Sequence, residues 1–260
     1  MATEHDRAVR TEFRRQSPTF EAEDSFFADP RLAAWVARHL EPLDASMLVL
    51  ETACGAAHQG EAITERVGRV VGADVTPEML DVARRRLRNR DVERLALTRA
   101  DVATLPFRDD SFDLAFCRFA VHHFAEPRQQ LDEMARVCRD GGRLAIVDLI
   151  SAEPSMADAY NDCERRRDPS HTRALTADEL ESAVEGSGAT IVHTTQTDVQ
   201  VPVERWLAQA STPLAVADSL RAALRAEIDG GPPTGMRPVD GDGLSYTQTW
   251  EIVMGRVGGE

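Results

Sequence analysis

Lysine is absent from the 260-residue chain, so all 30 of its lysine or arginine positions are arginines. Schiff-base enzymes need a lysine amine, and P-loop NTPases and protein kinases place a lysine on the nucleotide phosphates. The composition therefore excludes P-loop NTPases, kinases and pyridoxal enzymes of the usual kind.

Cysteine is scarce, and the four cysteines lie far apart, at positions 54, 117, 138 and 163. They form no C-x-x-C pair, which argues against both a zinc site and a disulfide framework. We therefore predict no metal site and expect all four to be small buried thiols.

No apolar run approaches the ~20 residues that span a bilayer. The first sixteen residues are charged throughout and contain no apolar segment typical of a signal peptide, so we expect a cytoplasmic protein. The net charge of -14 argues against nucleic acid and against an anionic membrane surface as partners.

Strand and helix patterns alternate between residues 47 and 150. This alternation predicts right-handed crossovers and a parallel, doubly wound sheet with helices on both faces. The short apolar runs that we assign to strands are 47–53, 69–75, 95–101, 111–119 and 143–150. The amphipathic segments that we assign to helices are 58–67, 76–89 and 126–142, the last closed by a glycine pair.

The flanking segments have weaker patterns. Residues 1–45 predict helical pieces broken at Pro18 and Pro30. A capping box predicts a helix that starts after Thr176, and two alternating segments, 189–199 and 244–257, predict strands that pair at the sheet edge.

Carboxylates occupy three of the predicted strand ends: Glu51, Asp74 and Asp101. In an open parallel sheet, ligands bind at the carboxyl ends of the strands. A carboxylate is a poor neighbour for pyrophosphate but a good acceptor for ribose hydroxyls, an adenine amino group or an ammonium. These groups together describe a nucleoside with an amino-acid tail.

Five stretches resemble the class I S-adenosylmethionine-dependent methyltransferases, specifically the type-11 group that includes the ubiquinone and menaquinone C-methyltransferases. The resemblance covers roughly residues 45–195, and its most specific part is the D-x-x-x-L-P-F-x-D-x-S-F-D order. The stretches are VLETACGAA, VVGADVTPEMLDVAR, RADVATLPFRDDSFDLAFCRFAVHHF, EMARVCRDGGRLAIVDL and RRRDPSH.

The resemblance implies a Rossmann-like, mostly parallel, seven-stranded α/β sheet with an antiparallel edge strand and a lid, in one domain over 1–260. It would comprise an N-terminal helical cap (1–45), a cofactor-binding half (46–150) and a substrate-side half (151–260). Lid insertions are expected at 151–175 and 202–243.

The same resemblance implies roles for the cofactor loop and strand ends. Glu51 would lie near the amino group of S-adenosylmethionine, and the backbone from Ala53 through Gly55 to Ala57 would pass its methionine part. Asp74 would hold both ribose hydroxyls.

Further contacts are implied for the adenine and the reacting end. Val75 and Met79 would pack on the adenine, Asp101 would accept from its amino group, and Val102 would give a backbone contact. The remaining implied contacts are Arg118 and Phe119 under the sulfonium, with Phe13 and Gln16 on a segment that closes over the cofactor.

The cofactor loop departs from the family pattern, because relatives usually have glycine at position 57 and often at position 53. Alanine disfavours positive φ and adds a methyl group that faces the ligand. We therefore expect either right-handed φ values at Ala53 and Ala57, or a cofactor that sits slightly further out.

Histidines are the candidate bases. His122 and His123 are adjacent, so they rarely chelate one ion; one of them lines the acceptor pocket or both are structural, with neither option favoured. A base is needed only when the acceptor loses a proton, and His123 or His171 would then serve. The aromatic residues Trp206 and Tyr246 are expected to pack in the core, although Trp206 lies on a segment that covers the acceptor region.

The sequence thus predicts a cytoplasmic methyltransferase that acts on O, N or C of a small organic metabolite, as a monomer or homodimer. Its cofactor would be S-adenosyl-L-methionine and its product S-adenosyl-L-homocysteine. A protein that binds the cofactor without transferring methyl stays open as an alternative. A nicotinamide-dependent dehydrogenase is disfavoured, because the first loop lacks G-x-G-x-x-G.

Overall fold

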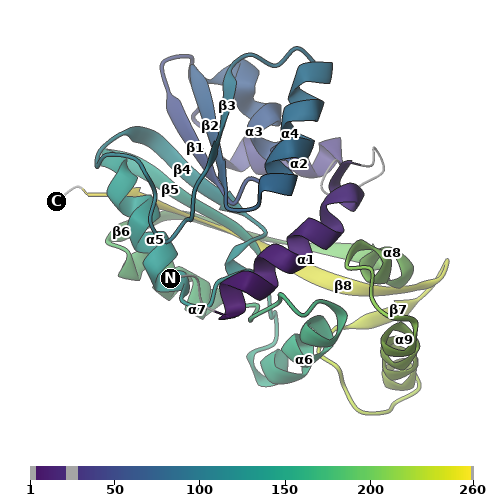
Figure 1. Cartoon of the computed structure of the whole chain (residues 1–260). Helices are drawn as coiled ribbons and strands as arrows, with labels where there is room; N and C mark the ends of the chain where they lie inside the picture. Colours follow the sequence, from purple (N-terminus) through teal and green to yellow (C-terminus); the bar gives the residue numbers. More distant parts are fainter. Residues whose placement is uncertain (1–3, 22–28, 259–260) are drawn as a thin grey trace.

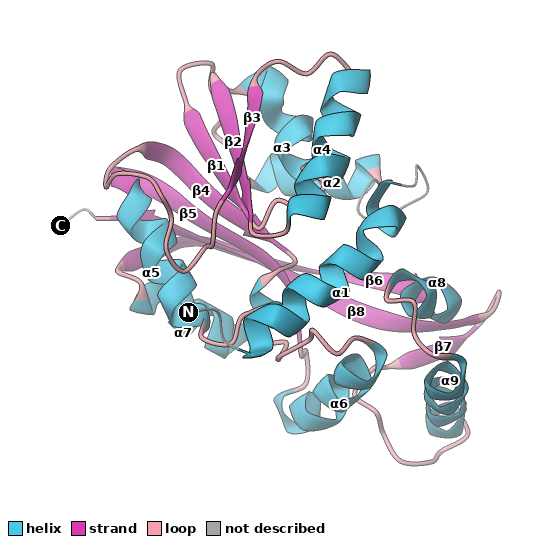
Figure 2. Cartoon of the chain, in the orientation of Figure 1, coloured by secondary structure: helices cyan, strands magenta, loops and turns pink. Residues whose placement is uncertain are grey.

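The structure is a computed structural model that describes residues 4–21 and 29–258. One twisted sheet crosses the molecule in the strand order β3-β2-β1-β4-β5-β8-β6, and short β7 pairs with β8 beside this path (Figures 1 and 2). The strands are β1 (Leu48–Thr52), β2 (Arg69–Asp74), β3 (Leu95–Arg99), β4 (Phe112–Arg118), β5 (Cys138–Ile150), β6 (Ala189–Pro202), β7 (Pro238–Asp240) and β8 (Leu244–Val257).

The first five strands of the sheet pair in parallel, whereas β8 runs antiparallel between β5 and β6. The predicted doubly wound, mostly parallel sheet with antiparallel pairing at one edge is confirmed. The path holds the seven predicted strands, and β7, only three residues long, adds an eighth.

Helices cover both faces because side chains alternate across each buried strand. On β4, Leu114 and Phe116 face the core under α2, α4, α8 and α9, while Ala115 and Cys117 face the core under α5 and α7. The helices are α1 (Glu4–Glu21), α2 (Pro30–His39), α3 (His58–Ile63), α4 (Pro77–Asn89), α5 (Pro127–Val137), α6 (Ala157–Arg167), α7 (Ala177–Gly186), α8 (Val203–Gln209) and α9 (Leu214–Ile228).

The expected break at Pro18 is wrong, because α1 continues through it to Glu21. Proline has no N–H to donate to the carbonyl four residues earlier, which normally destabilises a helix. Here the Ser17 hydroxyl donates to the Arg14 carbonyl over 3.0 Å and satisfies the group that Pro18 leaves unbonded. The break at Pro30 is confirmed in a different form, since Pro30 is the first residue of α2.

The glycine pair at 141–142 does not close α5, which ends at Val137. Cys138 is already extended and pairs with Phe112, and the register then shifts before Arg143 pairs with Leu114. Gly141, at φ 72°, lies in this irregular segment of β5. The glycines therefore form a bulge-like entry to the strand.

The loop between β1 and α3 adopts left-handed backbone at three of five positions. Ala53 has φ 48°, Gly55 φ 51° and Ala57 φ 58°, so the expected right-handed option for the two alanines is wrong. Backbone bonds from the Cys54 N–H to the Ala73 carbonyl (3.0 Å) and from the Ala57 N–H to the Cys54 carbonyl (2.7 Å) impose the shape. Left-handed backbone costs an alanine roughly 1–2 kcal/mol.

Replacing Ala57 with glycine tests this strain. Removing the left-handed strain should raise the free energy of unfolding by ~1–2 kcal/mol. Two losses offset this gain: the extra freedom of glycine in the unfolded chain costs ~0.4–1 kcal/mol, and the missing buried methyl group costs ~0.8 kcal/mol. We expect Ala57→Gly to leave the free energy of unfolding nearly unchanged in denaturant titrations. The control is Ala210→Gly, at an equally buried alanine with φ -87°, which should lose about 1–2 kcal/mol. Equal destabilisation of both variants would contradict the strained loop.

Candidate functional site

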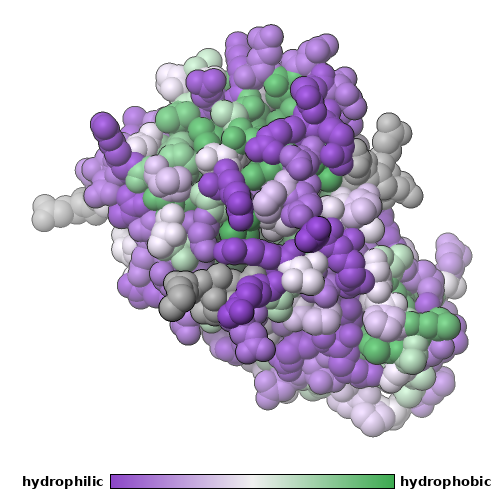
Figure 3. All heavy atoms as spheres, in the orientation of Figure 1, coloured by the Kyte–Doolittle hydropathy of each residue, from purple (hydrophilic) through white to green (hydrophobic). Residues whose placement is uncertain are grey.

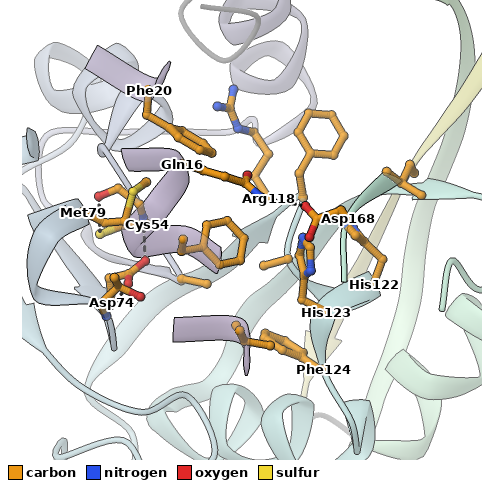
Figure 4. Close-up of a pocket in the computed structure, with 18 of the residues that line it drawn as sticks. Gln16, Phe20, Cys54, Asp74, Met79, Arg118, His122, His123, Phe124 and Asp168 are labelled. Carbon is orange, nitrogen blue, oxygen red and sulfur yellow. Dashed lines mark hydrogen bonds between the residues drawn. The ribbon is translucent and has the colours of Figure 1, made fainter. Parts of the chain in front are cut away.

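A cavity opens at the carboxyl ends of β1, β2 and β4, and α1 forms one wall of it. Figure 4 shows Cys54, Asp74 and Met79 on one side of the cavity and His122 and His123 on the other. The structure brings all twelve predicted cofactor residues to its lining: Phe13, Gln16, Glu51, Ala53, Gly55, Asp74, Val75, Met79, Asp101, Val102, Arg118 and Phe119.

Asp74 ends β2 and ties two other segments to it. Its Oδ2 accepts from the Gly55 N–H and its Oδ1 from the Thr76 N–H, each over 2.8 Å. The side chain is buried, with 7% of the residue exposed, and burial raises the pKa of Asp74 against these hydrogen bonds. A carboxylate offers about four acceptor sites, so two remain for a ligand.

Glu51 ends β1 and is more deeply buried, at 3% exposure. Its Oε2 accepts from the Gly60 N–H over 2.9 Å, and its Oε1 has no hydrogen-bond partner in the described part of the chain. Burial raises the pKa of Glu51 to about 7, although the Arg118 charge opposes the shift. The site thus holds a carboxyl group that a cationic ligand would stabilise.

Asp101 lies at the outer end of the cavity, beyond β3, with 46% of its side chain exposed. Its Oδ1 accepts from the Ala103 N–H over 3.0 Å, and its Oδ2 lies 3.7 Å from Nη2 of Arg10 on α1. Val102 follows it and is buried. Asp101 is therefore the most solvated of the three strand-end carboxylates.

Helix α1 reaches both ends of the cavity. Near one end Phe20 packs with Met79, and at the other Phe13 meets the His123 ring edge-on with 4.9 Å between ring centroids. The buried amide of Gln16 donates from Nε2 to Asp168 Oδ2 over 2.9 Å. Figure 3 shows mainly hydrophilic side chains over α1, so its outer face is polar while its inner face closes the cavity.

Arg118 and Phe119 leave β4 toward the cavity. Phe119 has φ 53°, a left-handed value rare for an aromatic residue, and its N–H donates to the Val147 carbonyl over 2.7 Å. Burial lowers the pKa of Arg118 to about 10, so the guanidinium still carries its charge at neutral pH. The sequence pattern did not predict the left-handed backbone conformation at Phe119.

His123 lines the cavity as predicted, but its surroundings make it a weak base. Its Nδ1 lies 2.9 Å from the Ser170 carbonyl oxygen, which can only accept, so Nδ1 carries the proton. Burial, with a contribution from His122, lowers the pKa of His123 to about 3.

His171, the other predicted base, is not among the residues that line the cavity. It is buried under α6, where its Nε2 lies 2.7 Å from Oδ1 of Asn161, and burial lowers its pKa strongly. The Asn161 oxygen also accepts from the Ala174 N–H over 2.7 Å. This geometry assigns His171 to the packing of the segment that follows α6, so the prediction of a catalytic role is not supported.

His122 lines the cavity and has a carboxylate partner that sequence reasoning missed. Its Nδ1 lies 2.5 Å from Oδ1 of Asp148, and the His122 N–H donates to Asp148 Oδ2 over 3.1 Å. Asp148 follows Val147, which is the partner of Arg118 in the β4–β5 register. The β4–β5 register brings Asp148 to His122, and no pattern in the sequence predicts that register.

The far end of the cavity is built from residues that follow β5 in the chain. Trp206 on α8 and Tyr246 on β8 both line it, with ring centroids 5.2 Å apart, so they are more than core packing. Gln248 lies beside them, and its Nε2 donates to the Tyr246 hydroxyl over 3.0 Å. Arg167 is also in the lining, but its Nε is paired with Glu164 at 2.9 Å.

No group of three or more His, Cys, Asp or Glu side chains in residues 4–21 and 29–258 is arranged to hold a metal ion. Within the same residues, no helix has the length and apolar character needed to cross a membrane. All four cysteines are buried free thiols, as expected.

Comparisons with known proteins identify methyltransferases as the proteins that this chain resembles. A family profile described as a methyltransferase domain matches residues 50–146. The uncharacterized methyltransferase YcgJ of Bacillus subtilis is 32% identical over 166 residues, which are 64% of this chain and 66% of that protein. Its crystal structure matches with a TM-score of 0.79 at 24% identity, over 88% of this chain and 100% of the other.

Two further matches cover part of the chain or share its fold. A demethylmenaquinone methyltransferase of Clavibacter sepedonicus is 40% identical over 101 residues, about two fifths of either chain (39% and 40%). The [4+2]-cyclase SpnF shares the fold with a TM-score of 0.64 at 18% identity, over 90% of this chain and 82% of that one. Taken with the sheet order, the profile and YcgJ place the chain in the family of S-adenosylmethionine-dependent methyltransferases.

Proposed function

We propose that this protein binds S-adenosyl-L-methionine in the cavity and transfers its methyl group to a small organic molecule, leaving S-adenosyl-L-homocysteine. The observation that carries the proposal is the meeting of three strand-end carboxylates, Glu51, Asp74 and Asp101, at one cavity. Their acceptors match the three polar parts of the cofactor: ammonium, ribose hydroxyls and adenine amino group.

The residues present fit the cofactor. Oε1 of the buried Glu51 carboxyl, which no described residue hydrogen-bonds, would pair with an ammonium. Asp74 would use its remaining acceptor capacity for the ribose, beside the bonds to Gly55 and Thr76. Met79 is buried beside the loop, with its methyl carbon 3.0 Å from a Cβ built at Gly55. A side chain at Gly55 would therefore close the space between loop and helix.

The bound cofactor would supply an already activated methyl group, so the chain mainly orients the acceptor and excludes water. Helix α1 performs the second task in this structure, because Phe13, Gln16 and Phe20 form the wall between the cavity and solvent. The acceptor would enter the end lined by Trp206 and Tyr246. Because the chain's net charge is -14, a small metabolite is a better candidate than nucleic acid.

A second candidate is a protein of this fold that binds the cofactor without transferring methyl. It is favoured by the strained alanines of the loop and by the fold shared with a [4+2]-cyclase. Cofactor binding alone does not separate the candidates, whereas formation of S-adenosylhomocysteine with an acceptor does.

Ligand-dependent thermal unfolding tests the cofactor site. At 100 times the dissociation constant a ligand adds ~2.7 kcal/mol, which for a domain of this size raises the midpoint by roughly 5–10 °C. We expect this rise with S-adenosylmethionine and S-adenosylhomocysteine but not with NAD. Asp74→Asn should weaken cofactor affinity ~10–100-fold, because it removes hydrogen bonds to a charged group.

The matched control is Asp81→Asn, on the exposed face of α4, where the carboxylate pairs with Arg84. Its ligand-induced shift should equal that of the wild type. An unchanged shift in Asp74→Asn, or a shift with NAD alone, would overturn the assignment of the site.

The pH dependence of cofactor affinity tests Glu51. The ammonium pairs with the ionised carboxylate, and Glu51 titrates at about 7 in the free protein. Affinity should therefore fall ~10-fold as the pH drops one unit below that value. Glu51→Gln should bind weakly and lose this dependence in calorimetric titrations.

In the free protein, by contrast, the free energy of unfolding should fall as the pH rises. A carboxyl whose pKa is raised by folding stabilises most when it is protonated, so its contribution is full below its unfolded pKa and is lost as the pH rises through about 7. The wild type should thus lose stability relative to Glu51→Gln over that window. Parallel curves for the two proteins would contradict the raised pKa of the buried Glu51 carboxyl.

A further inference from the structure

Several hydrogen bonds fix the His122–Asp148 pair in place. Asp148 is 2% exposed and receives the His122 Nδ1–H at 2.5 Å, the His122 backbone N–H at 3.1 Å and the Leu149 N–H at 2.7 Å. The His122 carbonyl in turn accepts from the Thr172 N–H over 2.8 Å. Backbone and ring of His122 are therefore fixed by two neighbouring segments.

The pairing determines which ring nitrogen is free. A carboxylate can only accept from Nδ1, so Nε2 of the neutral ring carries the lone pair. Nε2 makes no hydrogen bond to any described residue, and the ring belongs to the cavity lining. The buried carboxylate would stabilise the imidazolium that forms when Nε2 takes a proton, as a base–orienter pair does.

The two histidines next to His122 are poorly suited to act as the base. The His123 ring lies 4.1 Å away and the His171 ring 5.4 Å away, centroid to centroid, and burial keeps both neutral at neutral pH. Asp148 is the carboxylate that contacts the His122 ring. His122, not His123, therefore has the geometry of a general base.

The cavity that His122 lines has surface that suits a flat, uncharged acceptor. Trp206 and Tyr246 provide aromatic surface, and Leu149 and Val201 provide apolar surface. Gln248 adds a neutral hydrogen-bonding group, with Oε1 receiving the Trp250 indole N–H at 2.7 Å. Arg167 is neutralised by Glu164 at 2.9 Å, with Asp168 at 3.9 Å, so it is not set up to bind an anionic acceptor.

We propose that His122, oriented by Asp148, is the general base that deprotonates a phenolic hydroxyl of an aromatic acceptor during methyl transfer. This rests on the proposed function. The hydroxyl proton moves to Nε2, the oxygen forms a bond to the methyl carbon, and the S–C bond breaks with its electron pair returning to sulfur. The products are an aryl methyl ether, neutral S-adenosylhomocysteine and the imidazolium of His122, which Asp148 stabilises.

The test uses the full chain with a panel of hydroxynaphthalenes and hydroxyflavones, each beside the matching aromatic amine. Product mass and S-adenosylhomocysteine are measured. We expect phenols to be methylated on oxygen and the amines to be inert. His122→Asn should lower kcat ~10²–10⁴-fold, with the affinity for S-adenosylmethionine unchanged. Asp148→Asn should lower kcat by a smaller factor and shift the pH profile.

A second readout separates a base from a structural residue. The same phenols carrying two ortho fluorines are more acidic and are largely ionised at mildly alkaline pH, where they need no base, so His122→Asn should lose far less activity on them at that pH. His193→Gln, an exposed histidine that stacks on His39, is the control and should match the wild type throughout.

Three results would overturn the inference: equal losses on phenols and fluorinated phenols, methylation of amines alone, or no turnover of any phenol by protein that binds S-adenosylmethionine. Failure to bind S-adenosylmethionine would instead overturn the proposed function. A His122→Asn variant that still gains the ligand-induced thermal shift is folded, so its kinetic loss is informative.

Discussion

Two backbone N–H groups, from Gly55 and Thr76, converge on the buried carboxylate of Asp74. That convergence fixes the loop after β1 against the start of α4, and it is the constraint on which the cavity depends. The loop adopts three left-handed residues to reach Asp74, two of them alanines, so part of its strain is balanced by a charge-assisted hydrogen bond. Glycine is common at such positions because it avoids that strain.

Helix α1 gives the cavity its second constraint. Arg10 and Phe20 contact one end of the cavity, at Asp101 and Met79. Phe13 and Gln16 contact the other, at His123 and Asp168. The Gln16–Asp168 hydrogen bond links this helix to the segment after α6, which also holds His123 through Ser170. The two ends of the cavity are thus parts of one packed unit.

Much of the fold followed from local pattern. Apolar runs predicted strand ends at Glu51, Asp74 and Asp101; β2 does end at Asp74 and β1 one residue after Glu51, whereas β3 ends at Arg99, two residues before Asp101. The Thr176–Glu179 capping box has a direct sequence signature. The predictions of local structure failed where particular hydrogen bonds determine the backbone conformation. Pro18 stays within α1, where the Ser17 hydroxyl satisfies the Arg14 carbonyl. The loop alanines turn left-handed in a loop that backbone hydrogen bonds at Cys54 and Ala57 hold in place.

The partners of His122 and His171 were harder to predict from the sequence than the carboxylates at the strand ends. His122 and Asp148 are 26 residues apart and meet only through the β4–β5 register, whereas periodicity describes one element at a time. His171 was predicted as a base from its place in a segment shared with relatives, but Asn161 holds it away from the cavity. Side-chain partners of this kind are set by tertiary packing, which a single sequence does not encode as a pattern.

The most direct measurement is a crystal structure with S-adenosylhomocysteine. The account predicts both ribose hydroxyls within about 3 Å of the Asp74 carboxylate, the ammonium at Glu51 and the sulfur directed toward His122 and Trp206. A ligand bound elsewhere, or bound in the cavity with its ribose away from Asp74, would contradict it.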